Sequence, residues 1–431
     1  MKHFDPISSL CTVILISLLI SASADGKRMN RTLSDDPAGA PAGIDQPNTL
    51  QTYSGMPHEL IRGLLDEEGK RIFGDEDPAG DFIDRKVMNG HAGSSFGRSV
   101  SSAGDVNGDG YNDFIVGAYT ENSEYGKAYI YFGGASINLI PDVIMSGETS
   151  DSRLGHSVGS ANDLNADGYD DVIIGAFGYN GFSGRAYIHF GGPNMDNVPD
   201  ITLSEGTYGD FFGFCVTSAG DFNGDGFMDA AVGLTGYSTG GRVYIYYGGL
   251  MMDSVADFVL TGETMIDNFG VSVSAADVNG DGFTDLAVGA LQYNSYQGRA
   301  YVYFGGPLLD NTADVTMTGE TANSSFGYVV TCAGDINGDG IADIAAGAHE
   351  YNSYQGKAYL FYGGSNIDNT ADVILTGASS GLAFARYISY AGDINGDGFS
   401  DLAVGAPFAG SNTGEAYIFF GGANMNTTAD I

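Results

Sequence analysis

The run "GDINGDG" occurs at Gly334–Gly340 and again, unchanged, at Gly392–Gly398. Four close variants stand earlier in the chain, and an aromatic residue followed by Gly-Gly recurs with them, from Phe132-Gly133-Gly134 to Phe420-Gly421-Gly422. The first Asp residues of the six runs lie 58, 58, 56, 58 and 58 residues apart, at Asp105, Asp163, Asp221, Asp277, Asp335 and Asp393. Two markers that keep one period over six copies define an internal repeat.

Each acidic run reads D-x-N-x-D-G-x-x-D. Side-chain oxygens stand at positions 1, 3, 5 and 9, the carbonyl of position 7 can turn inward, and Gly at position 6 permits a sharp bend. Because oxygen ligands without His or Cys favour calcium over zinc or copper, we predict six calcium loops. Their ligands, with position 7 acting through its carbonyl, are Asp105, Asn107, Asp109, Tyr111 and Asp113; Asp163, Asn165, Asp167, Tyr169 and Asp171; Asp221, Asn223, Asp225, Phe227 and Asp229; Asp277, Asn279, Asp281, Phe283 and Asp285; Asp335, Asn337, Asp339, Ile341 and Asp343; and Asp393, Asn395, Asp397, Phe399 and Asp401.

A solvated Asn/Asp/Gly turn is the alternative interpretation of any single run. Three carboxylates about 5 Å apart, however, repel one another by about 3 kcal/mol per pair at an effective dielectric constant near 20. Six copies with the same ligand types therefore indicate a cation. An EF-hand also needs flanking helices and an acidic twelfth residue, whereas Val116 and Val288 stand at that position in the first and fourth copies.

The composition favours an all-β fold. Of the 431 residues, 67 are Gly, 26 Tyr and 25 Phe, and none is Trp, which is typical of short strands joined by tight turns. The fourth copy predicts strands at Phe269–Val273, Leu286–Ala290, Arg299–Phe304 and Asp314–Met317. A lone four-stranded antiparallel sheet cannot bury both faces, so the copies must stack, and stacking around a ring gives a β-propeller.

The number of blades has two accounts. Asp84–Met88 stands where a fourth strand would be, and the chain stops at Asp430-Ile431, where the fourth strand of the sixth copy would begin. The N-terminal strand would then close a six-bladed propeller. The alternative is a seven-bladed propeller of which one blade is missing from the sequence.

The N-terminal segment does not follow the repeat. Residues 1–24 have a basic start, an apolar stretch at Leu10–Ile20 and a small-x-small cleavage site, which predict a secretory signal peptide. An uncleaved anchor is the alternative, although the stretch is short for a bilayer span. Residues 25–80 are expected to be a linker with a short helix at Pro57–Phe73, and residues 81–431 to be the calcium-binding propeller. The protein is expected to be secreted or at the cell surface.

The charge and the cysteines restrict the partners. A formal net charge of −37, with only 17 Lys and Arg, argues against binding to nucleic acid or anionic lipid. We expect no membrane span after signal removal, and a monomer. Cys11 lies in the signal, and Cys215 and Cys332 occupy different places in the repeat, so we predict two buried, unpaired thiols rather than a disulfide.

The repeat resembles the FG-GAP repeat. Phe-Gly heads the first strand, as at Phe96-Gly97, the acidic loop follows, and a Val-Gly-Ala-like segment closes the second strand, with the full Gly-Ala-Pro only at Gly405–Pro407. The resemblance covers residues 81–431 and is to the N-terminal β-propeller of integrin alpha chains. It implies a calcium-binding extracellular propeller for adhesion or ligand recognition, with metal loops on one face and recognition loops on the other.

The sequence also departs from that family. Integrin propellers have seven repeats, only some of which bind calcium, and their chains continue into leg domains and a membrane span. This chain has six calcium-type repeats and no such span, which puts heterodimer formation in doubt. Leu154, Ala385 and Ala166 replace the expected Phe, Gly and loop Gly.

Two classes of function remain open. The preferred one is an adhesion or ligand-recognition module for an extracellular protein or carbohydrate, with calcium in a structural role. Loops such as "YNSYQG" at Tyr293–Gly298 and Tyr351–Gly356 offer rings and amides for such a ligand, or else only pack on neighbouring blades. The alternative is a propeller enzyme acting on extracellular polysaccharide, for which Arg98, His156 and Arg386 would face a central channel.

One motif suggests a hydrolase. "GHSVG" at Gly155–Gly159 fits the pattern of a nucleophile elbow, which requires a strand-to-helix turn in a parallel sheet. Ser157 instead occupies the same place in the repeat as Ser99 and Ser272, within a first strand. We therefore assign no catalytic residue and no enzymatic activity.

Overall fold

The computed structural model describes residues 88–135, 138–236 and 240–431. The predicted signal peptide at 1–24 and the predicted linker with its helix at 25–80 lie outside the described residues. The predicted closing strand at Asp84–Met88 also lies outside them, except for Met88 itself.

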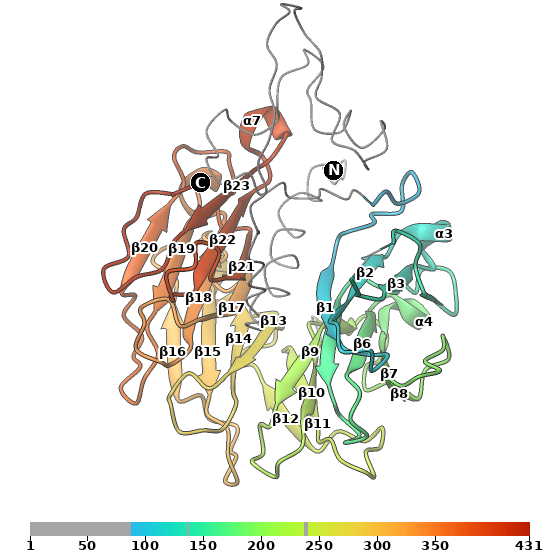
Figure 1. The fold of residues 1–431 in the computed structure, drawn as a ribbon. Helices are drawn as coiled ribbons and strands as arrows, with labels where there is room; N and C mark the ends of the chain where they lie inside the picture. Colours follow the sequence, from blue (N-terminus) through green and yellow to red (C-terminus); the bar gives the residue numbers. More distant parts are fainter. Residues whose placement is uncertain (1–87, 136–137, 237–239) are drawn as a thin grey trace, which may run out of the picture. The chain divides into compact units, whose positions relative to one another are not determined.

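The described chain is all-β and forms six antiparallel sheets, one for each copy of the repeat, as Figure 1 shows. Five sheets have four strands in chain order and the sixth has three, the arrangement expected of the blades of a six-bladed propeller. The strands are β1 (Val100–Gly104), β2 (Asp113–Ala118), β3 (Lys127–Tyr131) and β4 (Val143–Ser146); β5 (Val158–Asn162), β6 (Asp171–Ala176), β7 (Arg185–His189) and β8 (Ile201–Leu203); β9 (Phe212–Gly220), β10 (Asp229–Leu234), β11 (Arg242–Tyr246) and β12 (Phe258–Thr261); β13 (Phe269–Ala276), β14 (Asp285–Ala290), β15 (Arg299–Tyr303) and β16 (Val315–Thr318); β17 (Val329–Gly334), β18 (Asp343–Ala348), β19 (Lys357–Phe361) and β20 (Val373–Thr376); and β21 (Tyr387–Gly392), β22 (Asp401–Ala406) and β23 (Glu415–Phe419).

One-turn helical segments connect the second and third strands of five sheets. They are α3 (Glu121–Glu124), α4 (Tyr179–Phe182), α5 (Tyr293–Tyr296), α6 (Tyr351–Tyr354) and α7 (Ala409–Asn412). Because neighbouring strands are antiparallel, these segments lie at the opposite end of each sheet from the acidic loops, which connect the first and second strands.

The predicted strands of the fourth copy are confirmed to within a few residues. β15 ends at Tyr303, one residue before the predicted end, because the backbone N–H of Phe304 donates to a carboxylate oxygen of Asp314 at 2.8 Å instead of joining the ladder. The same bond recurs in all six copies, between the aromatic residue of the Gly-Gly marker and an Asp ten residues later. The Asp acceptors are Asp142, Asp200, Asp257, Asp314, Asp372 and Asp430.

The hydrophobic core lies between successive sheets. Val302 and Met317 of the fourth sheet, for example, pack in one cluster with Val330 and Ile344 of the fifth. Four similar clusters join the other consecutive pairs of sheets. The structure thus confirms that a single sheet of this repeat buries its apolar faces against its neighbours.

A glycine in each second strand permits this close stacking. A Cβ atom on Gly289 would overlap with the carbonyl oxygen of Gly327, which heads the first strand of the next sheet. Gly117, Gly175, Gly233 and Gly347 stand against the next sheet in the same way. The Gly of the Val-Gly-Ala-like segment is therefore required by an inter-sheet contact.

The first and sixth sheets do not share such a core within the described residues. Their apolar side chains form two separate clusters, one around Val116 and Tyr129 and the other around Ala403 and Ile418. A Cβ atom on Gly405 would meet only Tyr387 of its own sheet, at 3.5 Å. The six sheets of the described residues are consistent with a six-bladed ring, and the seven-bladed alternative stays a prediction.

We predict that Gly289→Ala lowers the free energy of unfolding by about 3 kcal/mol, because the added methyl group overlaps with a backbone carbonyl that cannot move away. Gly405→Ala is the matched control and should change it by less than about 1 kcal/mol. Urea unfolding of both variants measures the difference. Equal destabilisation by the two substitutions would contradict this packing account.

Candidate metal centres

All six acidic runs form loops between the first and second strands of their sheets. In the first loop the carboxylate of Asp105 accepts the backbone N–H groups of Gly108, Asp109 and Gly110 at 2.8 to 3.0 Å. The bond from the Gly at position 6 recurs in every loop. The chain therefore folds around the carboxylate of position 1.

The side chains of positions 3 and 5 contact each other inside the loop. The amide oxygen of Asn107 accepts the backbone N–H of Asp109 at 2.8 Å, and its amide nitrogen donates to the Asp109 carboxylate at 3.2 Å. That carboxylate also accepts the N–H of Tyr111 at 3.0 Å. The other five loops repeat these three bonds. Side-chain oxygens of positions 1, 3 and 5 thus gather inside each turn.

The Asp of position 9 begins the second strand and fastens the loop to the sheet. The two carboxylate oxygens of Asp113 accept the N–H groups of Val106, in the loop, and of Gly133, in the Gly-Gly marker, at 3.0 and 2.6 Å. All six copies repeat both bonds. The sequence identified the Gly-Gly pair only as a marker. Its distance from position 9, which is 20 residues in five copies and 19 in the third, was the signal of this role.

The position-9 carboxyl groups carry raised pKa values. Burial raises the pKa of Asp171, Asp229 and Asp285 to about 7, and that of Asp113 and Asp343 to about 6, although backbone hydrogen bonds act in the opposite direction. Burial therefore makes the ionised form costly in the protein alone, and a bound cation would offset that cost.

The donor set fits a calcium ion. The oxygens come from carboxylates, an amide and a backbone carbonyl, the ligands that calcium prefers. In the third loop, Oδ1 of Asp221 is buried and has no hydrogen-bond partner among the described residues, as expected of an oxygen reserved for a cation. The described residues contain no ready-made group of three or more His, Cys, Asp or Glu side chains that could hold a metal.

Neighbouring loops are tied to one another. In the second to sixth copies, the second Gly of the Gly-Gly marker donates its N–H to the position-2 carbonyl of the preceding loop, as from Gly192 to Val106 at 2.7 Å. The position-7 side chain also packs on the preceding loop, with Tyr169 against Gly108 and Phe283 against Gly224. Tyr111 has no preceding loop among the described residues, and it is 49% exposed. The acidic loops thus form one connected row.

In the loops at the other end of the sheets, the first tyrosine of three copies already packs on a cation of the same chain. The ring of Tyr293 lies 3.8 Å from the Arg299 guanidinium carbon, and Arg299 pairs with Glu263 of the preceding repeat at 2.7 Å. Tyr179 with Arg185 and Glu148, and Tyr351 with Lys357 and Glu320, repeat this arrangement. These first tyrosines join repeats together. Tyr296 and Tyr354 remain exposed, at 42% each.

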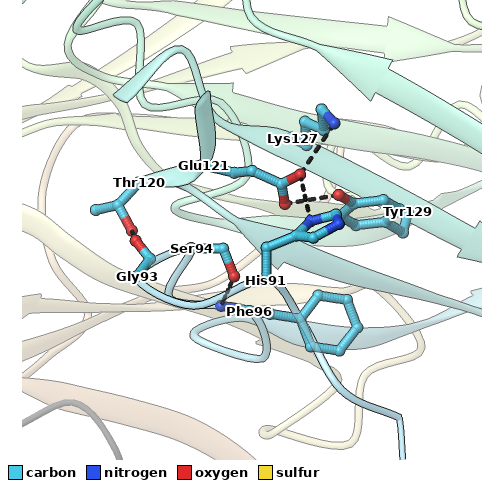
Figure 2. A network of polar contacts seen from close by, with 8 residues as sticks. All are labelled: His91, Gly93, Ser94, Phe96, Thr120, Glu121, Lys127 and Tyr129. Atoms are coloured by element: carbon cyan, nitrogen blue, oxygen red, sulfur yellow. Dashed lines mark hydrogen bonds and ion pairs between the residues drawn. The ribbon is translucent and has the colours of Figure 1, made fainter. Parts of the chain in front are cut away.

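The first repeat varies this arrangement, as Figure 2 shows. Glu121 replaces the tyrosine and its buried carboxylate accepts hydrogen bonds from Lys127 at 2.9 Å and from the Tyr129 hydroxyl at 2.6 Å, and contacts His91 Nδ1 at 2.9 Å. Burial acts to raise the pKa of Glu121, but these hydrogen bonds outweigh it and hold the pKa below its usual value. Glu121 is therefore a structural anion.

Ser157 serves the packing between sheets. Its hydroxyl oxygen accepts the backbone N–H of Val216 in the next repeat at 3.0 Å. Ser99 and Ser272 bind the equivalent N–H groups of Val158 and Val330. Ser157 and Ser99 stand directly before β5 and β1, one residue outside the predicted strand, whereas Ser272 lies within β13 as expected. Cys215 and Cys332 are unpaired, as predicted, but both residues are half-buried rather than buried.

Comparison with known proteins identifies the repeat. The model of the FG-GAP repeat matches six segments, at residues 96–131, 154–189, 216–246, 269–303, 326–361 and 385–419. Each segment begins near the head of a first strand and ends in a third strand. The chain therefore belongs to the FG-GAP repeat proteins.

The similar curated proteins are integrin alpha chains. Integrin alpha-5 of Xenopus laevis is 31% identical over 299 residues, which cover 64% of this chain and 27% of that protein. Integrin alpha-7 of Rattus norvegicus is 32% identical over 248 residues, which cover 55% and 20%. Integrin alpha-6 of Gallus gallus is 37% identical over 158 residues, which cover 35% and 14%. The chain thus matches about a quarter or less of the length of these relatives.

We predict that Asp339→Ala removes one equivalent of bound calcium, because it deletes the position-5 ligand of the fifth loop. The melting temperature should fall in calcium and stay nearly unchanged in chelator. Calorimetric titration and thermal unfolding measure the two effects.

Asp368→Ala is the matched control, since it removes the same charge from the same repeat but deletes only a turn acceptor for the N–H of Thr370. It should keep the full calcium equivalents. Retention of every equivalent by the Asp339→Ala variant would show that position 5 is not a ligand.

Proposed function

We propose that the chain is a secreted calcium-binding β-propeller that serves as an adhesion or ligand-recognition module, with calcium in a structural role. The observation that carries this proposal is the set of six loops, all with the same ligand types and the same internal hydrogen bonds. We assign residues 1–24 to a signal peptide, 25–80 to a linker and 81–431 to the propeller. The signal peptide supports a location outside the cell or at its surface.

The proposed role of calcium is to stabilise the fold. Bound calcium supplies the positive charge that the gathered carboxylates lack. If each loop has a Kd near 10⁻⁴ M, about 1 mM free calcium contributes about 1.4 kcal/mol per loop, or about 8 kcal/mol for six. This is comparable with the whole stability of a typical domain, which is about 5 to 15 kcal/mol.

The relatives support a role in recognition. They are integrin alpha chains that match 64% and 55% of this chain, in which FG-GAP repeats occur between residues 96 and 419. We propose an extracellular protein or carbohydrate as the ligand, and a monomer that acts without enzymatic chemistry. The described part of the chain holds no helix with the length and apolar character of a bilayer span.

We predict calcium-sensitive binding to at least one extracellular ligand. The mature protein would be screened against arrayed glycans and immobilised matrix proteins, in calcium and in chelator, since an intact ring is needed to present the loops. The Asp339→Ala variant should bind the same ligand more weakly at limiting calcium. Absence of calcium-sensitive binding across both panels would contradict the proposed function.

A further inference from the structure

Six residues occupy equivalent positions directly after the Gly or Ala that heads each first strand. The first strands of consecutive sheets lie side by side (Figure 1). These residues stand near the start of those strands, at the end of the sheets opposite the acidic loops. They are Arg98, His156, Phe214, Val271, Tyr328 and Arg386. In a chain with 17 Lys and Arg against 54 Asp and Glu, two arginines in one such set are unusual.

Arg386 is surrounded by rings. Its guanidinium carbon lies 5.2 Å from the ring centre of Tyr328, 5.9 Å from that of Tyr387 and 6.0 Å from that of Phe408. Its Nη1 lies 3.3 Å from Nε2 of His349. A guanidinium held among aromatic faces is partly stripped of water but stays charged.

Arg98 approaches the same place from the first repeat. Its guanidinium carbon lies 5.9 Å from the Tyr387 ring centre, the same distance as that of Arg386. Burial first, and then the charge of Arg98, lowers the pKa of His156 to about 3, so that imidazole is neutral. Two cations therefore share one tyrosine ring where the first and sixth repeats meet.

The side chains around Arg98 and Arg386 offer more hydrogen-bond donors than acceptors. Within the described residues, neither Arg98 nor Arg386 has a carboxylate oxygen within 4.0 Å. The carboxylate of Glu350 instead accepts hydrogen bonds from Ser325 at 2.7 Å and from Tyr354 at 3.3 Å.

His349 adds another donor. Burial, with a contribution from Arg386, lowers the pKa of His349 to about 3, so its ring is neutral. If Nε2 accepts from Arg386, the proton is on Nδ1, which is buried and has no partner among the described residues.

Five of the six other Lys and Arg side chains of the described residues differ from this pair. Lys127, Arg153, Arg185, Arg299 and Lys357 each lie within 3.0 Å of a glutamate oxygen. Five of the six other cations are thus matched by a carboxylate of the same chain, whereas Arg242 donates to the hydroxyl of Tyr244 at 3.2 Å. Arg98 and Arg386 differ from Arg242 because they lie beside one ring, Tyr387. Burial acts to lower the pKa of Arg386 and the charge of Glu350 acts to raise it, but no carboxylate oxygen of the described residues lies within 4.0 Å of either arginine, which points to a carboxylate supplied by a ligand.

We propose that Arg98 and Arg386, which both lie beside the Tyr387 ring, form a binding site for a single carboxylate presented by a protein partner. This inference rests on the proposed recognition function and names the chemistry of its ligand. Guanidinium groups bind carboxylates through paired hydrogen bonds, and the surrounding rings strengthen them by excluding water. The partner is basic overall, because a net charge of −37 attracts a basic surface and repels a polyanion.

The test uses two acetylated, amidated peptides with a neutral dye, in which Lys and Gly surround either one Asp or one Asn. Binding to the calcium-loaded mature protein is followed by fluorescence anisotropy at low ionic strength. The Asp peptide should bind at least about tenfold more tightly than the Asn peptide, because a charge-assisted hydrogen bond is lost in the latter. Equal binding, or no binding of either peptide, overturns the proposal.

Arg98→Gln and Arg386→Gln should each remove most of that preference. Arg299→Gln, which deletes a cation already paired with Glu263, should preserve it. Circular dichroism would reveal a Gln variant that fails to fold. Arg98→Lys or Arg386→Lys then replaces it, and because lysine keeps the positive charge, the variant should retain part of the preference for the Asp peptide. An unchanged preference in folded variants of Arg98 and Arg386 overturns the proposal.

A third probe distinguishes the class of partner. Oligogalacturonate that binds in an Arg386-dependent manner, while the Asp peptide does not bind, would overturn the assignment to a protein partner in favour of an acidic polysaccharide.

The proposed function and the proposed carboxylate site can fail separately. A calcium-sensitive matrix ligand that binds Arg98→Gln and Arg386→Gln normally would sustain the proposed function and overturn this site. Asp-specific peptide binding, with no ligand found among the arrayed glycans and matrix proteins, would sustain this site and overturn the proposed function.

Discussion

The structure depends on carboxylates that the chain itself brings together. In each acidic loop, backbone N–H groups fix the Asp of position 1, and Asn and Asp at positions 3 and 5 lie against each other, as Asn337 and Asp339 do at 3.0 Å. Hydrogen bonds from N–H groups offset part of the negative charge but supply no unit charge of opposite sign. The Asp of position 9 connects the loop to the sheet, because its carboxylate accepts backbone N–H groups from both the loop and the Gly-Gly marker.

The repeats are joined by a few contacts that recur from one to the next. Gly192 and its equivalents bind the preceding loop, Gly289 and its equivalents let the next first strand approach, and Ser157 and its equivalents bind its backbone. Because each loop touches the next, a cation in one loop should restrict its neighbours as well. Stability and calcium affinity are therefore expected to be properties of the row of loops rather than of single sites.

Much of this architecture could be predicted from the sequence, because the repeat fixes local structure. The period, the strands and the loop that begins at Asp105 all follow from short-range patterns. The pairing of Tyr293 with Arg299 and Glu263 could not, since the glutamate belongs to the preceding repeat and only the stacking of sheets brings it close. Nor could the sequence show that Arg98 and Arg386 share one ring, because 288 positions separate them.

The most direct test of the central claim is thermal unfolding of the mature chain in about 1 mM calcium and in excess chelator. If the gathered carboxylates require a cation, chelation should remove about 8 kcal/mol of stability and lower the melting temperature by about 10 °C or more. Magnesium at the same concentration should restore little, because it prefers a smaller octahedral site and gives up its water reluctantly. An identical melting temperature in calcium and in chelator would contradict the account.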